Sequence, residues 1–143
     1  GTVVLSPGML VFSLACKVEK ELEIREYARL INCRIIEFLE NSLKADYRQN
    51  GISDLCIGDR KIMGSGMYRR RNIIFFQASI LVDPDLTLME RYLKPPPKQP
   101  DYRNKRKHAD FVTTLKNEGL NITTFELATL LHRFLENKIG KIF

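Results

Sequence analysis

The sequence predicts an α+β fold, in which helices pack against a mixed and mostly antiparallel β-sheet. Along the chain, strand patterning is followed by one long helical segment, then by further strands, and finally by helices. This order differs from the regular alternation of strand and helix that builds a doubly wound parallel sheet. At 143 residues the chain can bury one core, so we expect residues 1–143 to form a single domain.

The first expected elements are strands at residues 2–5 and 9–18, separated by a turn at Pro7-Gly8. Apolar residues occupy both alternating rows of residues 9–18, which predicts a central strand of the sheet. A helix is expected over residues 21–43, because apolar residues recur there every three or four positions. These residues are Tyr27, Leu30, Ile31, Ile35 and Leu39.

The clearest local signal is a β-hairpin that joins residues 53–57 to residues 60–70. Gly58-Asp59 fits the two-residue turn between these strands. With this register Leu55 lies opposite Ile62, on an apolar face that suits the core.

Lys61 falls on the other face of this hairpin, together with Asp54, Cys56 and Met63. Asp54 and Lys61 are then diagonal neighbours on adjacent strands, about 7–8 Å apart at Cα and within side-chain reach. Judged by geometry alone, an ordinary surface ion pair explains them better than a binding site does. The segment Gly64-Ser65-Gly66 favours a site, because glycine within a strand often marks a bulge or a place where a ligand approaches the backbone.

A strongly apolar strand is expected at residues 73–82. One of its faces is wholly apolar, whereas Gln77 and Ser79 interrupt the other. Buried polar side chains need partners. A ligand in a mostly apolar pocket would satisfy them, and hydrogen bonds to a neighbouring strand or a water would satisfy them equally well.

The end of the chain predicts helices at residues 85–93 and 124–138. Thr123 and Glu126 have the spacing of a capping box at the start of the second helix. The proline-rich residues 94–100 lie between the helices and predict an extended surface connection.

The composition favours a cytoplasmic protein. The net charge of +6 favours an anionic partner such as a nucleotide, a nucleic acid or an acidic protein. Cys16, Cys33 and Cys56 are odd in number and lack metal or disulfide spacing, which indicates a reducing compartment. The sequence contains neither a secretory signal nor an apolar run of the roughly 20 residues that a membrane span needs. His108 and His132 lack the spacing of metal ligands.

Residues 53–66, which read S-D-L-C-I-G-D-R-K-I-M-G-S-G, resemble the signature of the lipoate–protein ligase A family, approximately N-D-L-V-V-N-G-R-K-I-S-G-S-A. Residues 1–13 resemble the family segment G-A-V-x-H-D-x-G-N-L-N-F-S. Residues 77–81 stand where the family has H-G-T-L-L, and residues 110–115 resemble its R-V-T-N-L element. The matches are collinear and span residues 1 to about 115, and the R-K-I-x-G-S block is the most specific of them.

The resemblance implies a biotinyl/lipoyl protein ligase fold and a two-step reaction. Lipoate reacts with ATP and Mg²⁺ to give lipoyl-adenylate, which a lysine of an acceptor lipoyl domain then attacks. The acceptor would be a lipoyl-carrying subunit of a dehydrogenase complex or the carrier protein of glycine cleavage.

The resemblance also implies roles for individual residues. Lys61 would hold the acyl carboxylate and then the acyl-phosphate, and Asp54 would orient Lys61 or bind the magnesium or the nucleotide. Residues expected to contact the nucleotide or the acyl group are Gly1, Thr2, Val3, Ser53, Asp54, Gly64, Ser65, Gly66, Gln77 and Ser79. Of these, residues 1–3 would line the acyl channel, and the backbone N–H groups of residues 64–66 would hold phosphate oxygens.

Several positions depart from the family pattern. Met9 and Val11 replace two asparagines and Gln77 replaces a histidine. The arginine- and glycine-rich segment of the family would precede residue 1, so we expect an N-terminally truncated catalytic domain. An incomplete homologue that binds an acyl group without activating it is therefore an alternative, and the sequence leaves open whether that group is lipoate, octanoate or biotin.

Two further alternatives are less favoured. An octanoyl or lipoyl transferase would need a cysteine nucleophile near Asp46, where none lies, and we expect Cys56 to be structural. A nucleic-acid-binding module is suggested by the basic segments 68–71 and 102–108, but a basic patch without a motif is weak support for it.

Overall fold

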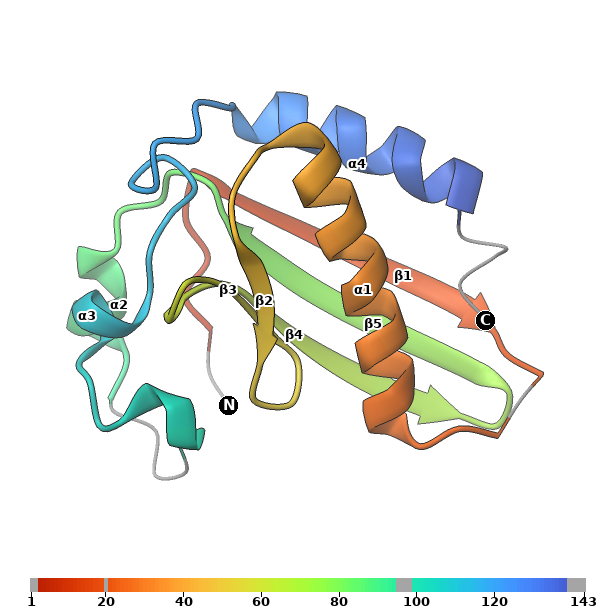
Figure 1. The fold of residues 1–143 in the computed structure, drawn as a ribbon. Coiled ribbons are helices and arrows are strands. Elements are labelled where there is room, and N and C mark those ends of the chain that lie inside the picture. Colours follow the sequence, from red (N-terminus) through yellow and green to blue (C-terminus); the bar gives the residue numbers. More distant parts are fainter. Residues whose placement is uncertain (1–2, 20, 95–98, 139–143) are drawn as a thin grey trace.

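The computed structural model describes residues 3–19, 21–94 and 99–138, and it confirms the α+β prediction (Figure 1). Five antiparallel strands form one sheet in the order β1-β5-β4-β3-β2. The strands are β1 (Met9–Lys17), β2 (Tyr47–Asn50), β3 (Asp54–Ile57), β4 (Arg60–Arg70) and β5 (Ile73–Leu81). The helices are α1 (Ile24–Ser42), α2 (Thr87–Tyr92), the 3₁₀ turn η1 (Asp101–Arg103), α3 (His108–Phe111) and α4 (Thr124–Lys138). One isolated parallel bridge joins Lys61 to Val112.

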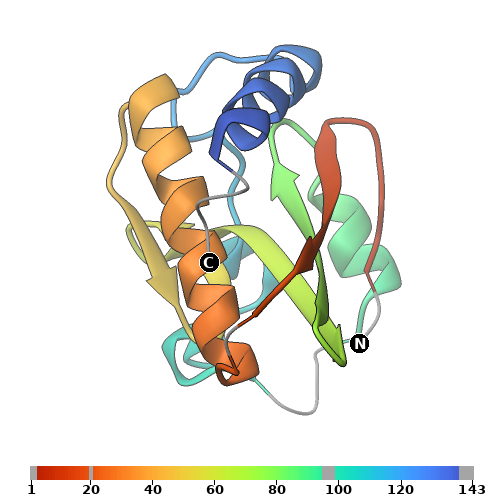
Figure 2. The same ribbon diagram turned by 90° about the vertical axis from the view of Figure 1, so that its right-hand side faces the viewer.

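Helices α1 and α4 cover one face of the sheet and close the main core (Figures 1 and 2). The predicted stripe of α1 is buried at Tyr27, Ile31, Ile35 and Leu39. The two helices meet through Phe38 and Phe134, whose ring centroids lie 5.4 Å apart. The buried side of β5 is its predicted apolar face, and it packs beneath these helices.

The predicted capping box of α4 is confirmed. The Glu126 carboxylate accepts a hydrogen bond from the Thr123 backbone N–H, and the Thr123 hydroxyl accepts one from the Glu126 backbone N–H. These contacts satisfy two donors that the first turn of a helix leaves unpaired.

Two predictions about the N-terminal strands are wrong. Residues 3–5 lie outside the sheet, and both Val3 and Leu5 are exposed. Strand β1 is an edge strand and not a central one, because within the described residues it pairs with β5 alone. Its second apolar row lacks a covering layer in the described part of the chain, and Val11 is exposed there. The apolar residues on both alternating rows of β1 therefore did not mean that the strand has a neighbour on each side.

The β3–β4 hairpin has the predicted turn and a different register beyond it. Cys56 pairs with Lys61 as expected, but Leu55 pairs with Met63 and not with Ile62, because a bulge adds one residue to β4. Ile62 and Met63 are both buried as a result. Met63 therefore belongs to the core side of the sheet, and the alternation of side chains returns Gly64 to the face that carries Lys61.

The remaining differences concern short or polar segments. Strand β2, with the polar sequence Y-R-Q-N, was not predicted. Helix α2 is shorter than the expected range 85–93. Most of the proline-rich connection, residues 95–98, lies outside the described residues. In the described part of the chain, we find no helix with the length and apolar character needed to cross a membrane.

The geometry of the turn at Gly8 predicts that replacing this glycine lowers the stability of the protein. Gly8 has φ of +86°, and a Cβ built on it would lie 2.3 Å from the Asp83 carbonyl oxygen. Gly119 has φ of +79° and no atom within 4 Å of such a Cβ. Replacing either glycine strains the backbone by about 1–2 kcal/mol. We expect the clash to cost Gly8→Ala a further amount of about 2 kcal/mol, measured as the difference in the free energy of unfolding in urea. Equal losses in the two variants would contradict the clash.

Candidate functional site

Lys61 and Asp54 form an ion pair on the face of the sheet that α1 and α4 leave uncovered. The Lys61 Nζ lies 2.7 Å from the Asp54 Oδ1, and the side chains are 25% and 17% exposed. The turn at residues 58 and 59 places the two residues on adjacent strands within reach, as the hairpin predicted. An ammonium has three donors, so Lys61 can bind an anion while it holds Asp54.

Gly64 makes room for this ammonium. A Cβ at position 64 would lie 3.0 Å from the Lys61 Nζ and 3.1 Å from its Cε. The side chain of Lys61 therefore lies along β4 against a backbone without a side chain. This is the close approach that glycine within a strand indicates.

Tyr102 is a third member of the site, and the sequence did not reveal it. Its hydroxyl donates a hydrogen bond of 2.7 Å to the Asp54 Oδ2. Its ring contacts Phe111, with ring centroids 5.1 Å apart. Burial and then the neighbouring Asp54 raise the pKa of Tyr102, so that the hydroxyl remains a donor at neutral pH. Both oxygens of Asp54 are thus engaged, one by Tyr102 and the other by Lys61, an arrangement that would orient the ammonium.

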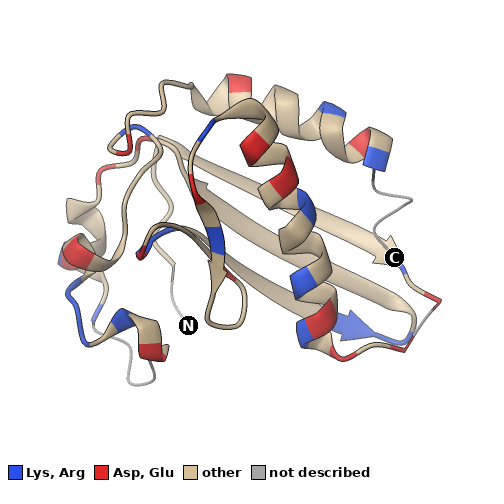
Figure 3. Cartoon of the chain, in the orientation of Figure 1, with Lys and Arg blue, Asp and Glu red and all other residues tan. Residues whose placement is uncertain are grey.

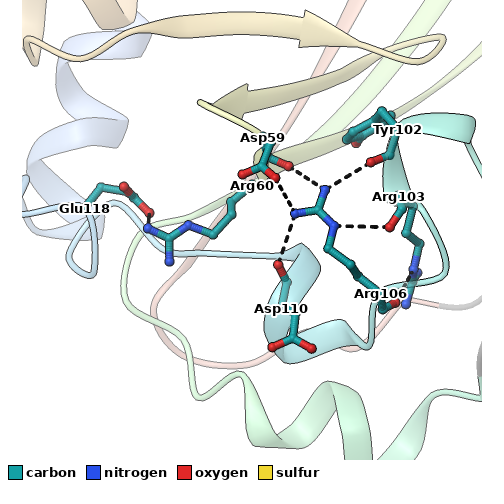
Figure 4. A network of polar contacts seen from close by, with 7 residues as sticks. All are labelled: Asp59, Arg60, Tyr102, Arg103, Arg106, Asp110 and Glu118. Carbon is teal, nitrogen blue, oxygen red and sulfur yellow. Dashed lines mark hydrogen bonds and ion pairs between the residues drawn. The ribbon is translucent and has the colours of Figure 1, made fainter.

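The backbone around Lys61 is held by a segment far along the chain. The Thr113 N–H donates to the Lys61 carbonyl oxygen at 2.9 Å. Next to it, the Arg106 guanidinium donates to the Asp59 carboxylate at 2.7 Å, to the Asp59 carbonyl at 2.9 Å and to the Tyr102 carbonyl at 3.0 Å (Figure 4). We call residues 101–113 the strap, because they cross the tip of the hairpin and fix it from outside.

The strap changes the interpretation of the basic segment 102–108. Arg103 is only 4% exposed, and its guanidinium lies 4.7 Å from the centroid of the Phe111 ring. In the other basic segment, Arg69 donates to the Leu22 carbonyl oxygen. These arginines bind the protein's own chain, and acidic residues are interspersed with Lys and Arg along the ribbon (Figure 3). Several arginines of the two basic segments, 68–71 and 102–108, therefore make contacts within the protein.

Ser53 and Ser65 lock the neighbouring strand ends together. The Ser65 hydroxyl donates to the Ser53 carbonyl oxygen at 3.1 Å, and Asn32 of α1 donates to the same oxygen at 3.2 Å. Ser65 pairs with Ala78, so its side chain belongs to the helix-covered face and not to the face of Lys61. The side chains of Ser53 and Ser65 therefore stabilise the hairpin. The predicted phosphate contact is a separate one, because it involves the backbone N–H groups of residues 64–66.

Gln77 and Ser79 lie on the same face of the sheet as Lys61. The pairing of the strands places Gly64 beside Ser79, and Gly66 beside Gln77. Gln77 is exposed and donates to the Ser13 hydroxyl at 3.4 Å, so the neighbouring strand supplies its partner. Exposed apolar residues continue this face away from Lys61: Val11, Tyr68, Ile73 and Phe75. Val3 is exposed, and Gly1 and Thr2 lie outside the described residues.

The three cysteines are free and differ in exposure. Cys56 is fully buried, and burial is the main cause that raises the pKa of its thiol. Burial also raises the pKa of Cys16, whereas Cys33 is exposed on α1. A thiol with a raised pKa is a poor nucleophile at neutral pH. No group of three or more metal-binding side chains occurs among the described residues.

Comparison with known proteins gives a consistent result. A family model described as the lipoyl protein ligase A/B catalytic domain matches residues 1–136. No curated protein matches the chain. The solved structure of a bi-partite lipoate protein ligase from Thermoplasma acidophilum, reported with its E2 lipoyl domain, is 23% identical with a TM-score of 0.75. The match covers 93% of this chain and 52% of the T. acidophilum protein.

Two further solved structures have the same fold. Protein Ta0514 from T. acidophilum with bound lipoic acid is 20% identical with a TM-score of 0.72, over 93% of this chain and 52% of that one. A lipoate-protein ligase A bound with ATP is 21% identical with a TM-score of 0.69, over 93% and 53%. The chain thus spans about half the length of these proteins, and the likeness confirms the predicted ligase fold.

The cysteine environments predict selective alkylation. With iodoacetamide at pH 7.5, we expect the exposed Cys33 to react quickly and Cys56 to react only after unfolding, because its thiol is buried and protonated. Intact-mass analysis should show one fast adduct, which Cys33→Ser abolishes. A fast adduct on Cys56 in the folded protein, located by peptide mapping, would contradict this assignment.

Proposed function

We propose that this chain, which belongs to the lipoyl protein ligase A/B catalytic-domain family, is the part of a lipoate–protein ligase that holds the acyl carboxylate during activation and transfer. The carboxylate of lipoate attacks the α-phosphorus of ATP, and pyrophosphate leaves. The amine of an acceptor lysine then attacks the acyl carbon of lipoyl-adenylate, and AMP leaves. The acceptor is a lipoyl domain, and Mg²⁺ enters with the phosphates of the nucleotide.

The observation that carries this proposal is the half-buried ammonium of Lys61. It is oriented by Asp54 at 2.7 Å, lies against Gly64 and keeps 25% of its side chain exposed. A positive charge held in place and partly removed from water favours a bound carboxylate, and then the negative charge that develops on the acyl-phosphate. The rigid placement also brings the reacting groups together without a reorganisation of the site.

The face of the sheet beside Lys61 suits the acyl chain. Its exposed apolar residues extend from the ion pair over β1, β4 and β5. Within the described residues, β4 beyond Met63 pairs with β5 alone, so alternate backbone N–H groups of residues 64–66 are available to phosphate oxygens. Lipoic acid and ATP bound to two proteins of the same fold, and the E2 lipoyl domain reported with a third, support these assignments.

A second candidate function is acyl binding without activation. It is favoured by Met9 and Val11, which stand where the family pattern has asparagines, and by Gln77, which stands where the family has a histidine. Cysteine-dependent transfer is less favoured, because Cys56 is buried with a raised pKa.

The proposed role of Lys61 predicts the outcome of an acylation assay. The 143-residue chain, and separately the longest form that its gene encodes, would be mixed with ATP, Mg²⁺, lipoate and an apo lipoyl domain. We expect a gain of one lipoyl group on the acceptor, detected by intact mass, and its loss in Lys61→Ala. Lys116→Ala is the matched control, because Lys116 forms an exposed ion pair with Asp83.

The controls separate the two candidate functions. A folded full-length protein that binds lipoate and leaves the acceptor unmodified would favour acyl binding without activation. Equal transfer by Lys61→Ala and the wild-type protein would remove Lys61 from the proposed site.

The close approach at Gly64 predicts a second functional effect. In Gly64→Ala the new methyl group would meet the mobile end of the Lys61 side chain, so the ammonium moves at little cost in stability. A misplacement of about 1 Å can lower a rate by about 100-fold, and the shift needed here is a few tenths of an ångström. We therefore expect the transfer rate of Gly64→Ala to fall about 4-fold below that of the wild-type protein. An unchanged rate, with an unchanged unfolding curve, would contradict this role.

A further inference from the structure

We propose that Tyr102 is a positioning residue for Lys61, and that its hydroxyl fixes the ammonium by fixing Asp54. Tyr102 itself does not touch the substrate. This inference rests on the proposed function for the role of the positioned lysine, while the positioning itself can be measured without substrate.

The contacts form a continuous chain of charge-assisted hydrogen bonds. The Tyr102 hydroxyl donates to one oxygen of Asp54 at 2.7 Å, and the Lys61 ammonium donates to the other at 2.7 Å. Asp54 is 17% exposed, so little water is available to replace a lost partner. Without the hydroxyl, the carboxylate would be free to rotate towards solvent, and the ammonium would follow it or lose its only described carboxylate partner.

The strap fixes the position of this hydroxyl from several sides. The Tyr102 carbonyl oxygen accepts a hydrogen bond of 3.0 Å from Arg106, which is itself bound to the turn residue Asp59 (Figure 4). The ring packs against Phe111. After η1 the chain reverses through Asn104 and Lys105, which adopt positive φ values of 47° and 58°. The hairpin that carries the ion pair and the strap that carries Tyr102 are thus joined at the tip.

The ring and the hydroxyl of Tyr102 have separable tasks. Contact with Phe111 requires an aromatic ring, which phenylalanine would also supply. The hydroxyl adds the bond to Asp54 and also interacts with the thiol of the buried Cys56. Because burial and Asp54 raise the pKa of Tyr102, the hydroxyl stays protonated at neutral pH and acts as a fixed donor, not as an acid or base.

The test uses Tyr102→Phe, which removes the hydroxyl and retains the ring. Tyr92→Phe is the matched control, because Tyr92 is exposed on α2. The first measurement is the ¹⁵N signal of the Lys61 ammonium in a lysine-labelled sample, assigned by its loss in Lys61→Ala. We expect this signal to broaden or move in Tyr102→Phe and in Asp54→Asn, and to stay unchanged in Tyr92→Phe, with backbone amide spectra verifying the fold of each variant.

The second measurement is the KM for lipoate and for ATP in the acylation assay. Loss of a hydrogen bond to a charged group corresponds to about a 10-fold weaker interaction. We expect the KM for lipoate to rise by about this factor in Tyr102→Phe, with the KM for ATP changed less than about 2-fold. A residue with a merely structural role would lower the midpoint of unfolding and leave this ratio and the Lys61 signal unchanged.

The outcomes separate this inference from the proposed function. An unchanged Lys61 signal in folded Tyr102→Phe would overturn the positioning role, whether or not the protein transfers lipoate. A perturbed Lys61 signal in a protein without transfer activity would support the positioning role and argue against the ligase function. Transfer by the wild-type protein, with an unchanged signal and an unchanged KM ratio in Tyr102→Phe, would leave the function standing and overturn this inference.

Discussion

One ion pair, between the Lys61 ammonium and the Asp54 carboxylate, organises the end of the sheet around it. Such partly buried pairs add little to the free energy of unfolding, because the cost of removing both charges from water offsets their attraction. The surrounding structure nevertheless converges on the pair: a two-residue turn, a bulge, a glycine and a distant tyrosine each set part of its geometry. This concentration of constraints on a charged group of small energetic value is what a binding site requires.

Helices cover one face of the sheet, and the other face carries the proposed binding residues. Helices α1 and α4 bury one face, and with it the aliphatic rows of β4 and β5. The other face carries Lys61, Gly64, Ser79 and Gln77 together with exposed apolar residues. The bulge in β4 links the two faces, because it places Ile62 and Met63 in the core and still returns Gly64 to the face of Lys61.

Local patterns in the sequence predicted much of this structure. Periodicity located α1, α4 and β5, and the Gly58-Asp59 turn predicted the approach of Lys61 to Asp54. The bulge was missed because ideal alternation assumes equal numbers of residues on both strands, and β2 was missed because its side chains are polar. The edge position of β1 depends on which neighbouring segments are present, and apolar patterning alone does not reveal that.

Tyr102 illustrates the limit of reasoning from local patterns. Its partner Asp54 is 48 residues away, and nothing in the intervening sequence specifies their contact. The cations beside Tyr102 indicated an anionic partner outside the molecule, whereas Arg103 and Arg106 bind within the strap itself. The sequence does not distinguish a buried arginine from an exposed one. The packing of Phe111 against Arg103 shows that this arginine is buried.

The strap also has a consequence for the order in which the chain folds. Its bonds to the hairpin span 47 and 48 residues, so they close a long loop, whereas the turn at Gly58-Asp59 closes a loop of two residues. Contacts of low sequence separation cost less chain entropy to close than contacts of high separation, and so tend to form earlier. The hairpin is therefore expected to form before the strap fixes Lys61. Until then, the Lys61 ammonium would be flexible and hydrated, and the proposed binding site would not be formed.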